Sequence, residues 1–231
     1  MSKALSPIEE NRRTLAAQVA ERIRQAILTR DLAPGSRVNQ YQLAEDLNVS
    51  LVPVREALKT LEAEGLVTIT PRRGAFVTEI SLDDLDELYF ARKLIEGEAI
   101  ALACQALSDH DFIILRGIID EMRAATANDD IHAFMQYNRD FHMHIYSATK
   151  NRHLFQMIET LWDRSELYRY RYMFVLRNAD VIHQEHEDIF TACQTRNVDR
   201  ARQLAQDHIW HTRNGIYQQL ASEFATETSE D

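Results

Sequence analysis

The fold of the N-terminal part is decided by Leu43-Ala-Glu-Asp-Leu-Asn-Val-Ser-Leu-Val-Pro-Val-Arg-Glu-Ala-Leu58. Apolar spacing predicts a short helix over about 40–47, and Asn48-Val-Ser50 predicts a tight turn. Ser50 suits the N-cap of a further helix over about 51–64, which tolerates Pro53 because the first helical turn has no intrahelical N–H bonds to lose. This stretch therefore predicts two helices joined by a turn.

One more helix precedes this pair, and a hairpin follows it. An apolar stripe at helical spacing predicts a helix over 14–30. Gly65 is suited to end the helix of 51–64 as a C′ glycine. Residues 66–70 and 75–78 then form two short strands around the basic tip Pro71-Arg-Arg-Gly74. Three helices followed by a small β wing predict a winged helix-turn-helix.

The rest of the chain has only helical periodicity. Ser81 is a suitable N-cap, so a domain boundary is expected near residue 80. Residues 81–222 are predicted to form an antiparallel all-helical bundle, and the acidic, polar end, 223–231, is predicted to be disordered. The fold class is therefore mainly α, with a winged helix-turn-helix over residues 1–80. Six helical segments are expected in the bundle, over 83–106, 109–127, 130–149, 151–177 with a break, 180–196 and 199–221.

Composition agrees with a helical globular protein, since 231 residues contain only 6 Gly and 4 Pro. The polar start of the chain and the lack of any run of about 18 apolar residues predict a cytoplasmic protein without a membrane partner. Cys104 and Cys193 stand among apolar helical residues, which favours buried thiols over a disulfide or redox pair.

The distribution of charge decides whether a nucleic acid is a plausible partner. A net charge of −10 argues against one, because phosphate contacts need Lys and Arg. However, residues 1–80 carry a net charge of +1, whereas residues 81–231 carry −11. The near-neutral N-terminal module can therefore gather its cations on one face.

Candidate DNA contacts follow from how a helix-turn-helix docks. The first turn of its second helix meets base edges in the major groove, while cations of the wing contact phosphates. A three-helix module that binds another protein is the alternative, and two adjacent arginines at a hairpin tip argue against it. The candidate contacts are Gln40, Tyr41, Ser50, Leu51, Val52, Arg55, Lys59, Arg72, Arg73 and Gly74.

Three of the nine histidines fall on apolar helical stripes. Asn138 and His142 are one turn apart on the inward face of one helix, and His186 and His208 lie on the inward stripes of two later helices. Uncompensated polar groups are costly in an interior, and shared coordination of one ion satisfies them together.

The sequence therefore predicts a divalent metal held by His142, His186 and His208. Zn, Ni and Mn are not distinguished by these ligand types. A metal-free pocket in which the histidines bind an effector directly is the alternative. His183 and His211, one turn from His186 and His208, are candidates for substitute ligands or for contacts behind the ligands.

Several segments resemble the GntR-type bacterial regulators, in particular the FadR-like branch whose effector domain is called FCD. The resemblance implies a homodimer that binds a two-fold symmetric DNA operator with one recognition helix per half-site. The matching segments are Ile27-Leu-Thr-Arg-Asp-Leu-Ala-Pro-Gly-Ser-Arg37, Leu43-Ala-Glu-Asp-Leu-Asn-Val-Ser50, Pro53-Val-Arg-Glu-Ala-Leu58, Leu61-Glu-Ala-Glu-Gly-Leu-Val67 and Pro71-Arg-Arg-Gly-Ala-Phe-Val77.

The chain departs from the family pattern at two places. Family members commonly have Ser-Arg-Thr where this chain has Ser50-Leu51-Val52, so an arginine contact to DNA is absent and the two apolar side chains are expected to meet thymine methyl groups. In the FCD pattern a carboxylate, a His one turn later and two more His on later helices hold a metal, so the resemblance implies that Asn138 is a ligand together with His142, His186 and His208. Asp is the commoner residue at position 138. Asn138 offers a carbonyl oxygen without a negative charge, which implies weaker metal binding.

The resemblance also suggests an effector contact. Arg92 lies in a segment similar to the first effector-domain helix, where an arginine often faces the pocket, and its guanidinium suits a carboxylate. A solvated arginine or a pair with Glu96 at i+4 is the alternative.

Together these features predict a ligand-responsive transcriptional regulator, a repressor that senses a small carboxylate at a metal site. An effector-independent DNA-binding protein is one alternative, and it leaves the inward polar residues unexplained. A metal-dependent enzyme is the other. It needs a general base beside the metal, and no motif supplies one.

Overall fold

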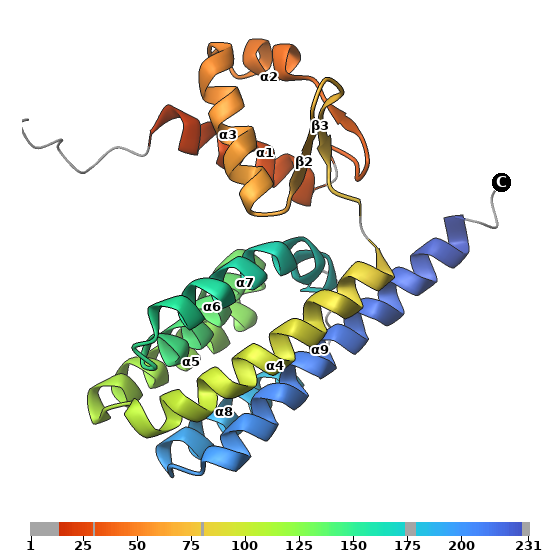
Figure 1. Ribbon diagram of the computed structural model, residues 1–231. Coiled ribbons are helices and arrows are strands. Elements are labelled where there is room, and N and C mark those ends of the chain that lie inside the picture. Colours follow the sequence, from red (N-terminus) through yellow and green to blue (C-terminus); the bar gives the residue numbers. More distant parts are fainter. Residues whose placement is uncertain (1–13, 30, 80, 174–178, 228–231) are drawn as a thin grey trace, which may run out of the picture. The chain divides into compact units, whose positions relative to one another are not determined.

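The computed structural model describes residues 14–29, 31–79, 81–173 and 179–227. Contacts between residues divide the chain into two compact units, and the boundary in the sequence lies between Glu79 and Ile80. Figure 1 shows the small mixed unit and the larger helical one. None of the described helices is long and apolar enough to cross a membrane.

The first unit is a winged helix-turn-helix. Its antiparallel sheet has the order β1-β3-β2. Sequence analysis predicted two strands and missed the third, because a two-residue strand has no periodicity to detect. The elements are α1 (Leu15–Leu28), β1 (Arg37–Val38), α2 (Gln40–Asp46), α3 (Leu51–Ala63), β2 (Val67–Thr70) and β3 (Gly74–Val77).

The core of this unit lies between α1 and α3. The predicted inner face of α3 is confirmed, since Val54, Ala57, Leu58 and Leu61 are buried. Gly65 follows α3 with φ +76°, the left-handed conformation in which glycine carries no steric penalty. The helix ends there, so the chain can turn into β2.

In the second unit, all secondary structure of the described residues is helical. The α9 helix continues to Glu227, so the predicted disorder was wrong for 223–227. Residues of high helix propensity such as Ala and Glu sustain a helix without an apolar stripe. Residues 228–231 lie outside the described residues, as does the end of the predicted segment 151–177. The helices are α4 (Leu82–Ala106), α5 (Asp109–Ala127), α6 (Ile131–Ser147), α7 (Arg152–Met173), α8 (Ala179–Gln194) and α9 (Val198–Glu227).

Figure 1 shows α4 and α9 running side by side in opposite directions. Gly97 permits their close approach, because a Cβ atom there would lie 2.6 Å from the side-chain nitrogen of Gln206. At the start of α4, the Ser81 hydroxyl accepts a hydrogen bond from the Asp84 N–H, as its capping role requires. Cys104 and Cys193 are buried free thiols, as predicted.

Polar side chains interrupt the apolar core of the second unit. Among the described residues, every buried polar or charged side chain belongs to this unit. Buried polar groups are costly unless they find partners, so their concentration in one bundle indicates a site. They are Arg92, Glu96, Asn138, His142, Ser165, Arg169, His183, His186 and His208.

Candidate DNA-binding surface and buried histidine centre

The first turn of α3 presents an unusual surface. Ser50 occupies the N-cap, but its side chain makes no capping hydrogen bond to the described part of the chain. Leu51 is half-buried, and Val52 exposes 63% of its surface. Nothing in the fold requires an exposed valine here, which agrees with an apolar contact to a base.

The start of α2 lies beside the exposed side of α3. The Arg55 Nε donates to Gln40 Oε1 at 3.4 Å, a contact that joins the two helices. Tyr41 is 70% exposed, and Lys59 is also exposed. These candidate contacts therefore remain accessible to a partner, whereas Val54, Ala57, Leu58 and Leu61 of α3 face the core.

The wing carries the two predicted cations. Arg72 has φ +65° at the hairpin tip, and both Arg72 and Arg73 are exposed. Gly74 has φ +107°, and a Cβ atom on it would lie 3.4 Å from Nε of Arg37. Sequence analysis missed Arg37, whose exposed guanidinium adds a cation beside the wing. Arg37, Gln40, Tyr41 and Gly74 line an open hollow of about 480 Å³.

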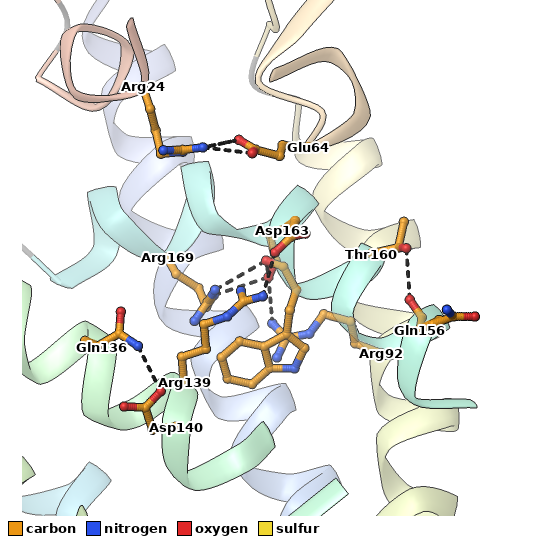
Figure 2. A network of polar contacts seen from close by, with 12 residues as sticks. Arg24, Glu64, Arg92, Gln136, Arg139, Asp140, Gln156, Thr160, Asp163 and Arg169 are labelled. Atoms are coloured by element: carbon orange, nitrogen blue, oxygen red, sulfur yellow. Dashed lines mark hydrogen bonds and ion pairs between the residues drawn. The ribbon is translucent and has the colours of Figure 1, made fainter. Parts of the chain in front are cut away.

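An ion pair holds the helices that support this surface. Arg24 of α1 pairs with Glu64, directly after α3, with Nη2 and Oε2 2.7 Å apart (Figure 2). The pair is partly buried, so solvent screens it less than a surface pair.

The second unit brings together three histidines from three helices. His142 of α6, His186 of α8 and His208 of α9 are buried, and each offers a ring nitrogen within 4.8 Å of those of the other two. The ring centroids of His142 lie 5.1 Å from those of both other rings. This is the arrangement that sequence periodicity predicted, and such a cluster can hold a metal ion.

Hydrogen bonds orient two of these rings. The Tyr146 hydroxyl donates its single hydrogen to Glu96 Oε2, at 2.8 Å. It also lies 3.4 Å from Nδ1 of His142, and in this second contact it can only accept a hydrogen bond. His142 then carries its proton on Nδ1. Likewise, Nδ1 of His208 lies 2.7 Å from Glu185 Oε2 and donates to it. In both rings Nε2 is therefore the nitrogen left to bind a metal.

The third ring lacks this support. Nδ1 of His186 is buried without a hydrogen-bond partner among the described residues, and its Nε2 lies 3.1 Å from Nε2 of His142. Burial, together with the neighbouring His208, holds the pKa of both His142 and His186 well below the usual value of 6.5. The imidazoles of His142 and His186 are therefore neutral at pH 7, and a neutral imidazole has a lone pair to offer to a shared cation. The donor set therefore fits a divalent transition metal.

A small cavity opens beside the cluster. Asn138, one turn before His142, lines it together with His208, Arg92 and Arg169. Its volume of about 30 Å³ has room for a water molecule rather than for an organic ligand. A ligand that occupies this cavity must therefore displace side chains around it.

Arg92 is engaged with the protein itself. Its Nε donates to Glu96 Oε1 at 2.7 Å and its Nη1 to the Ser165 hydroxyl at 3.2 Å. The pairing with Glu96, the alternative from sequence, is thus present, although Arg92 still borders the cavity. Arg169 was missed, because it follows Arg164, Glu166 and other polar residues on α7, and such a segment gives no signal of burial.

Two further histidines lie outside the cluster. Nε2 of His183 is 2.9 Å from the Thr126 hydroxyl, and its ring faces Phe134. His211 is half-exposed, and its Nδ1 lies 2.7 Å from Oε1 of Glu185, the carboxylate that also contacts His208. His183 is therefore separate from the three-histidine cluster, whereas His211 is linked to it through Glu185.

A winged helix-turn-helix with an exposed recognition helix, followed by a bundle with a buried polar centre, defines a DNA-binding transcriptional regulator. The chain belongs to the GntR family of bacterial regulatory proteins, within the group that carries an FCD domain. Residues 15–77 match the family model "Bacterial regulatory proteins, gntR family", and residues 87–211 match the FCD domain. The resemblance found in the sequence is confirmed.

Proteins similar to this chain are described as transcriptional regulators, not as enzymes. The chain is 32% identical over 211 residues to the uncharacterized HTH-type transcriptional regulator BphR of Paraburkholderia xenovorans, covering 86% of this chain and 84% of that protein. It is 26% identical over 197 residues to the HTH-type transcriptional repressor RspR of Escherichia coli, covering 83% and 86%. The solved structure of E. coli McbR/YncC matches with a TM-score of 0.75 and 26% identity, covering 90% of this chain and 100% of that one.

Proposed function

We propose that this regulator is a homodimeric repressor that binds a two-fold symmetric operator and releases it when a small carboxylate binds at a metal centre. The observation that carries the proposal is the convergence of three buried imidazoles beside a cavity that is also lined by an amide and two guanidinium groups. A protein that only bound DNA would have no need of such a costly interior.

His142, His186 and His208 would hold the ion, Zn, Ni or Mn, with Asn138 as a further oxygen donor. Imidazole nitrogens and an amide oxygen coordinate as neutral ligands, so a bound divalent ion would keep its full charge and attract a carboxylate to an open position. Glu185 and Tyr146 would act behind the ligands by fixing the ring protons of His208 and His142 on Nδ1.

Helix α7 is suited to carry the response to the DNA-binding unit. It contributes Arg169 to the cavity, and the preceding residue, Tyr168, contacts the start of α4. The Tyr168 hydroxyl donates to Asp84 Oδ2 at 2.8 Å and accepts from the Ser81 N–H at 3.4 Å. Because Ser81 follows the boundary between the two units, a shift of α7 would change the point at which the chain leaves the bundle.

Repression rather than activation is proposed because the relative RspR is named a repressor. A homodimer is proposed because one recognition helix covers a single half-site, whereas two linked modules read a symmetric operator. The wing arginines, Arg37 and the exposed first turn of α3 would supply the contacts to each half-site.

Metal analysis tests the proposal directly. Wild-type protein should retain about one transition-metal ion per chain by mass spectrometry, and His208→Ala should retain none. His153→Ala, which removes an exposed histidine of α7, is the matched control and should behave as wild type. A wild-type protein that neither retains nor binds Zn, Ni or Mn would contradict the metal site.

Asn138→Asp provides an opposite test. A carboxylate in place of the amide adds a negative charge among neutral ligands, so metal retention against a chelator should increase. The added charge should also weaken the binding of a carboxylate effector at the same ion. Metal retention in this variant equal to that of wild type would remove Asn138 from the proposed ligand set.

A further inference from the structure

We infer that Arg169 is a second anchoring point for the effector, and that the effector is a compact molecule with two acid groups, one for the metal centre and one for Arg169. This inference rests on the proposed function, because it assigns the chemistry of the ligand at the same cavity. It moves the ionic contact predicted for Arg92 to a residue that sequence analysis did not identify.

Arg169 is a buried cation that lacks a complete set of partners. Only 6% of its surface is exposed. Nε donates to the Ser165 hydroxyl at 3.2 Å and Nη2 to the Trp162 carbonyl at 3.3 Å. Nη1 is buried without a hydrogen-bond partner among the described residues. Within the described part of the chain, Arg169 thus has only neutral oxygens as acceptors, and Nη1 of its fork is unpaired.

The neighbouring arginine shows what is missing. Figure 2 shows Arg92 and Arg169 converging from α4 and α7. Both guanidinium carbons lie close to the Trp162 ring, at 4.6 and 4.1 Å from its centroid. Arg92 has Glu96 as its counter-ion, and that carboxylate also accepts hydrogen bonds from Tyr146 and from the Trp162 Nε1. Among the described residues, Arg92 thus has an ion-pair partner within this cluster and Arg169 has none.

The excess charge persists at neutral pH. Burial and the proximity of Arg92 lower the pKa of Arg169 to about 10, while Glu166 on the same helix partly opposes this shift. The guanidinium is still protonated at pH 7. A buried charge without a counter-ion is strongly unfavourable, and an anion that enters the cavity would remove the imbalance.

The cavity joins this cation to the histidine cluster. Arg169 lines the same space as Asn138 and His208, so one ligand in it would meet both the free fork of Arg169 and the ligands of the metal. A planar carboxylate matches the guanidinium fork with two parallel hydrogen bonds. A second acid group would serve the ion. Because the space is about 30 Å³, the ligand must be short and must push side chains outward.

Titration of the full-length, metal-loaded protein with acetate, malonate, succinate and inorganic phosphate tests the inference. Calorimetry should give tighter binding of a dicarboxylate than of acetate or phosphate. Arg169→Met should weaken dicarboxylate binding at least about tenfold and leave metal content unchanged. Arg164→Met removes an exposed arginine of the same helix and should bind as wild type. Arg169→Lys keeps the charge without the guanidinium fork, so its affinity for a dicarboxylate should fall between those of wild type and Arg169→Met.

Thermal unfolding separates an anion site from a structural role. If Arg169 forms an anion site, Arg169→Met should be at least as stable as wild type in the absence of ligand, because the substitution removes an unpaired buried charge. Added dicarboxylate should then raise the Tm of wild type and leave that of the variant unchanged. A variant that is destabilised yet gains the same rise in Tm as wild type would overturn the inference.

The outcomes also distinguish this inference from the proposed function. Equal dicarboxylate affinity in wild type and Arg169→Met, with metal present in both, would overturn the role of Arg169 and leave the metal-dependent regulator standing. Stronger binding of phosphate than of any dicarboxylate would overturn the assignment of two acid groups. Arg169-dependent acid binding by a wild-type protein that retains no metal would contradict the metal site and support the anion site.

Discussion

The two units of the chain place their polar residues in opposite ways. In the DNA-binding unit the candidate contacts are accessible, and an apolar residue, Val52, is exposed among them. In the helical unit the candidate ligands are buried, and His142 and His186 have almost no contact with solvent. The candidate contacts to DNA are thus side chains exposed to solvent, whereas the candidate ligands of the metal are side chains shielded from it.

This difference determines how each unit tolerates change. Exposed cations such as Arg72 and Arg73 do not contribute to a core, so their removal should affect DNA binding and little else. The buried residues are coupled, because Glu96 alone joins Arg92, Tyr146 and Trp162. Substitutions there should alter ligand binding and stability together.

The largest expected effect comes from separating the units. Residues 1–80 alone should bind a palindromic operator about 10² to 10⁴ times more weakly than the full chain, because a dimer makes the second half-site contact intramolecular. Fluorescence anisotropy with a palindromic operator and with a single half-site measures this. The two proteins should differ little on the half-site. Equal affinity for the palindrome would argue against a dimer held together by the helical unit.

Removing the wing cations should have the next largest effect. Arg72→Ala with Arg73→Ala should reduce the slope of log affinity against log salt by about 2, since each phosphate contact contributes about 0.9. Sequence preference should remain, because the first turn of α3 is unchanged. The matched control removes two exposed cations of the helical unit, Lys150 and Arg200. A loss of sequence preference without a change in salt slope would place base readout in the wing.

Tyr168→Phe should weaken the coupling between the ligand site and the start of α4. The variant loses the hydroxyl that contacts Ser81 and Asp84, at a cost to stability of about 1 kcal/mol. Metal content and ligand binding should be retained, while the ligand-induced change in operator affinity should fall severalfold. Tyr217→Phe, on α9, serves as the control. An unchanged ligand response would show that α7 does not transmit the signal through this contact.

The effect of acidification is confined to the helical unit. Burial keeps the pKa of His142 and His186 well below 6.5, so the unfolded chain binds more protons than the folded one as pH falls below that value. Stability is then greatest above pH 6.5. In the metal-free protein it should decrease by about 1 kcal/mol per pH unit for each histidine as pH falls below that value.

Urea unfolding at pH 7.5, 6.5 and 5.5 checks this dependence. His142→Gln with His186→Gln removes both titrating groups, so the decrease below pH 6.5 should become shallower than in wild type. The same slope in both proteins would mean that other groups cause the acid sensitivity.

Much of the fold could be predicted from the sequence, because periodicity, caps and turn residues are local signals. Gly65 and Ser81 marked ends that the structure also has. Two features escaped prediction for physical reasons. The strand Arg37–Val38 exists only because β3 pairs with it, and the end of α9 is helical although its composition is polar.

The candidate site was predictable only where apolar neighbours marked an inward face. Each of the three clustered histidines lies on an apolar helical stripe, and each is buried in the bundle. Arg169 has charged and polar neighbours along α7, so nothing local distinguishes it from a surface arginine. Its burial depends on where α7 packs, and this is a property of the bundle rather than of the segment.

The central claim, that one unit binds DNA and the other senses a ligand, is tested most directly by His142→Ala with His186→Ala. Operator affinity, metal content and the change in operator affinity with an added dicarboxylate should be measured on the same preparation. Metal and ligand response should be lost while operator affinity without ligand stays close to that of wild type. A metal-free double variant with a full ligand response would contradict this account.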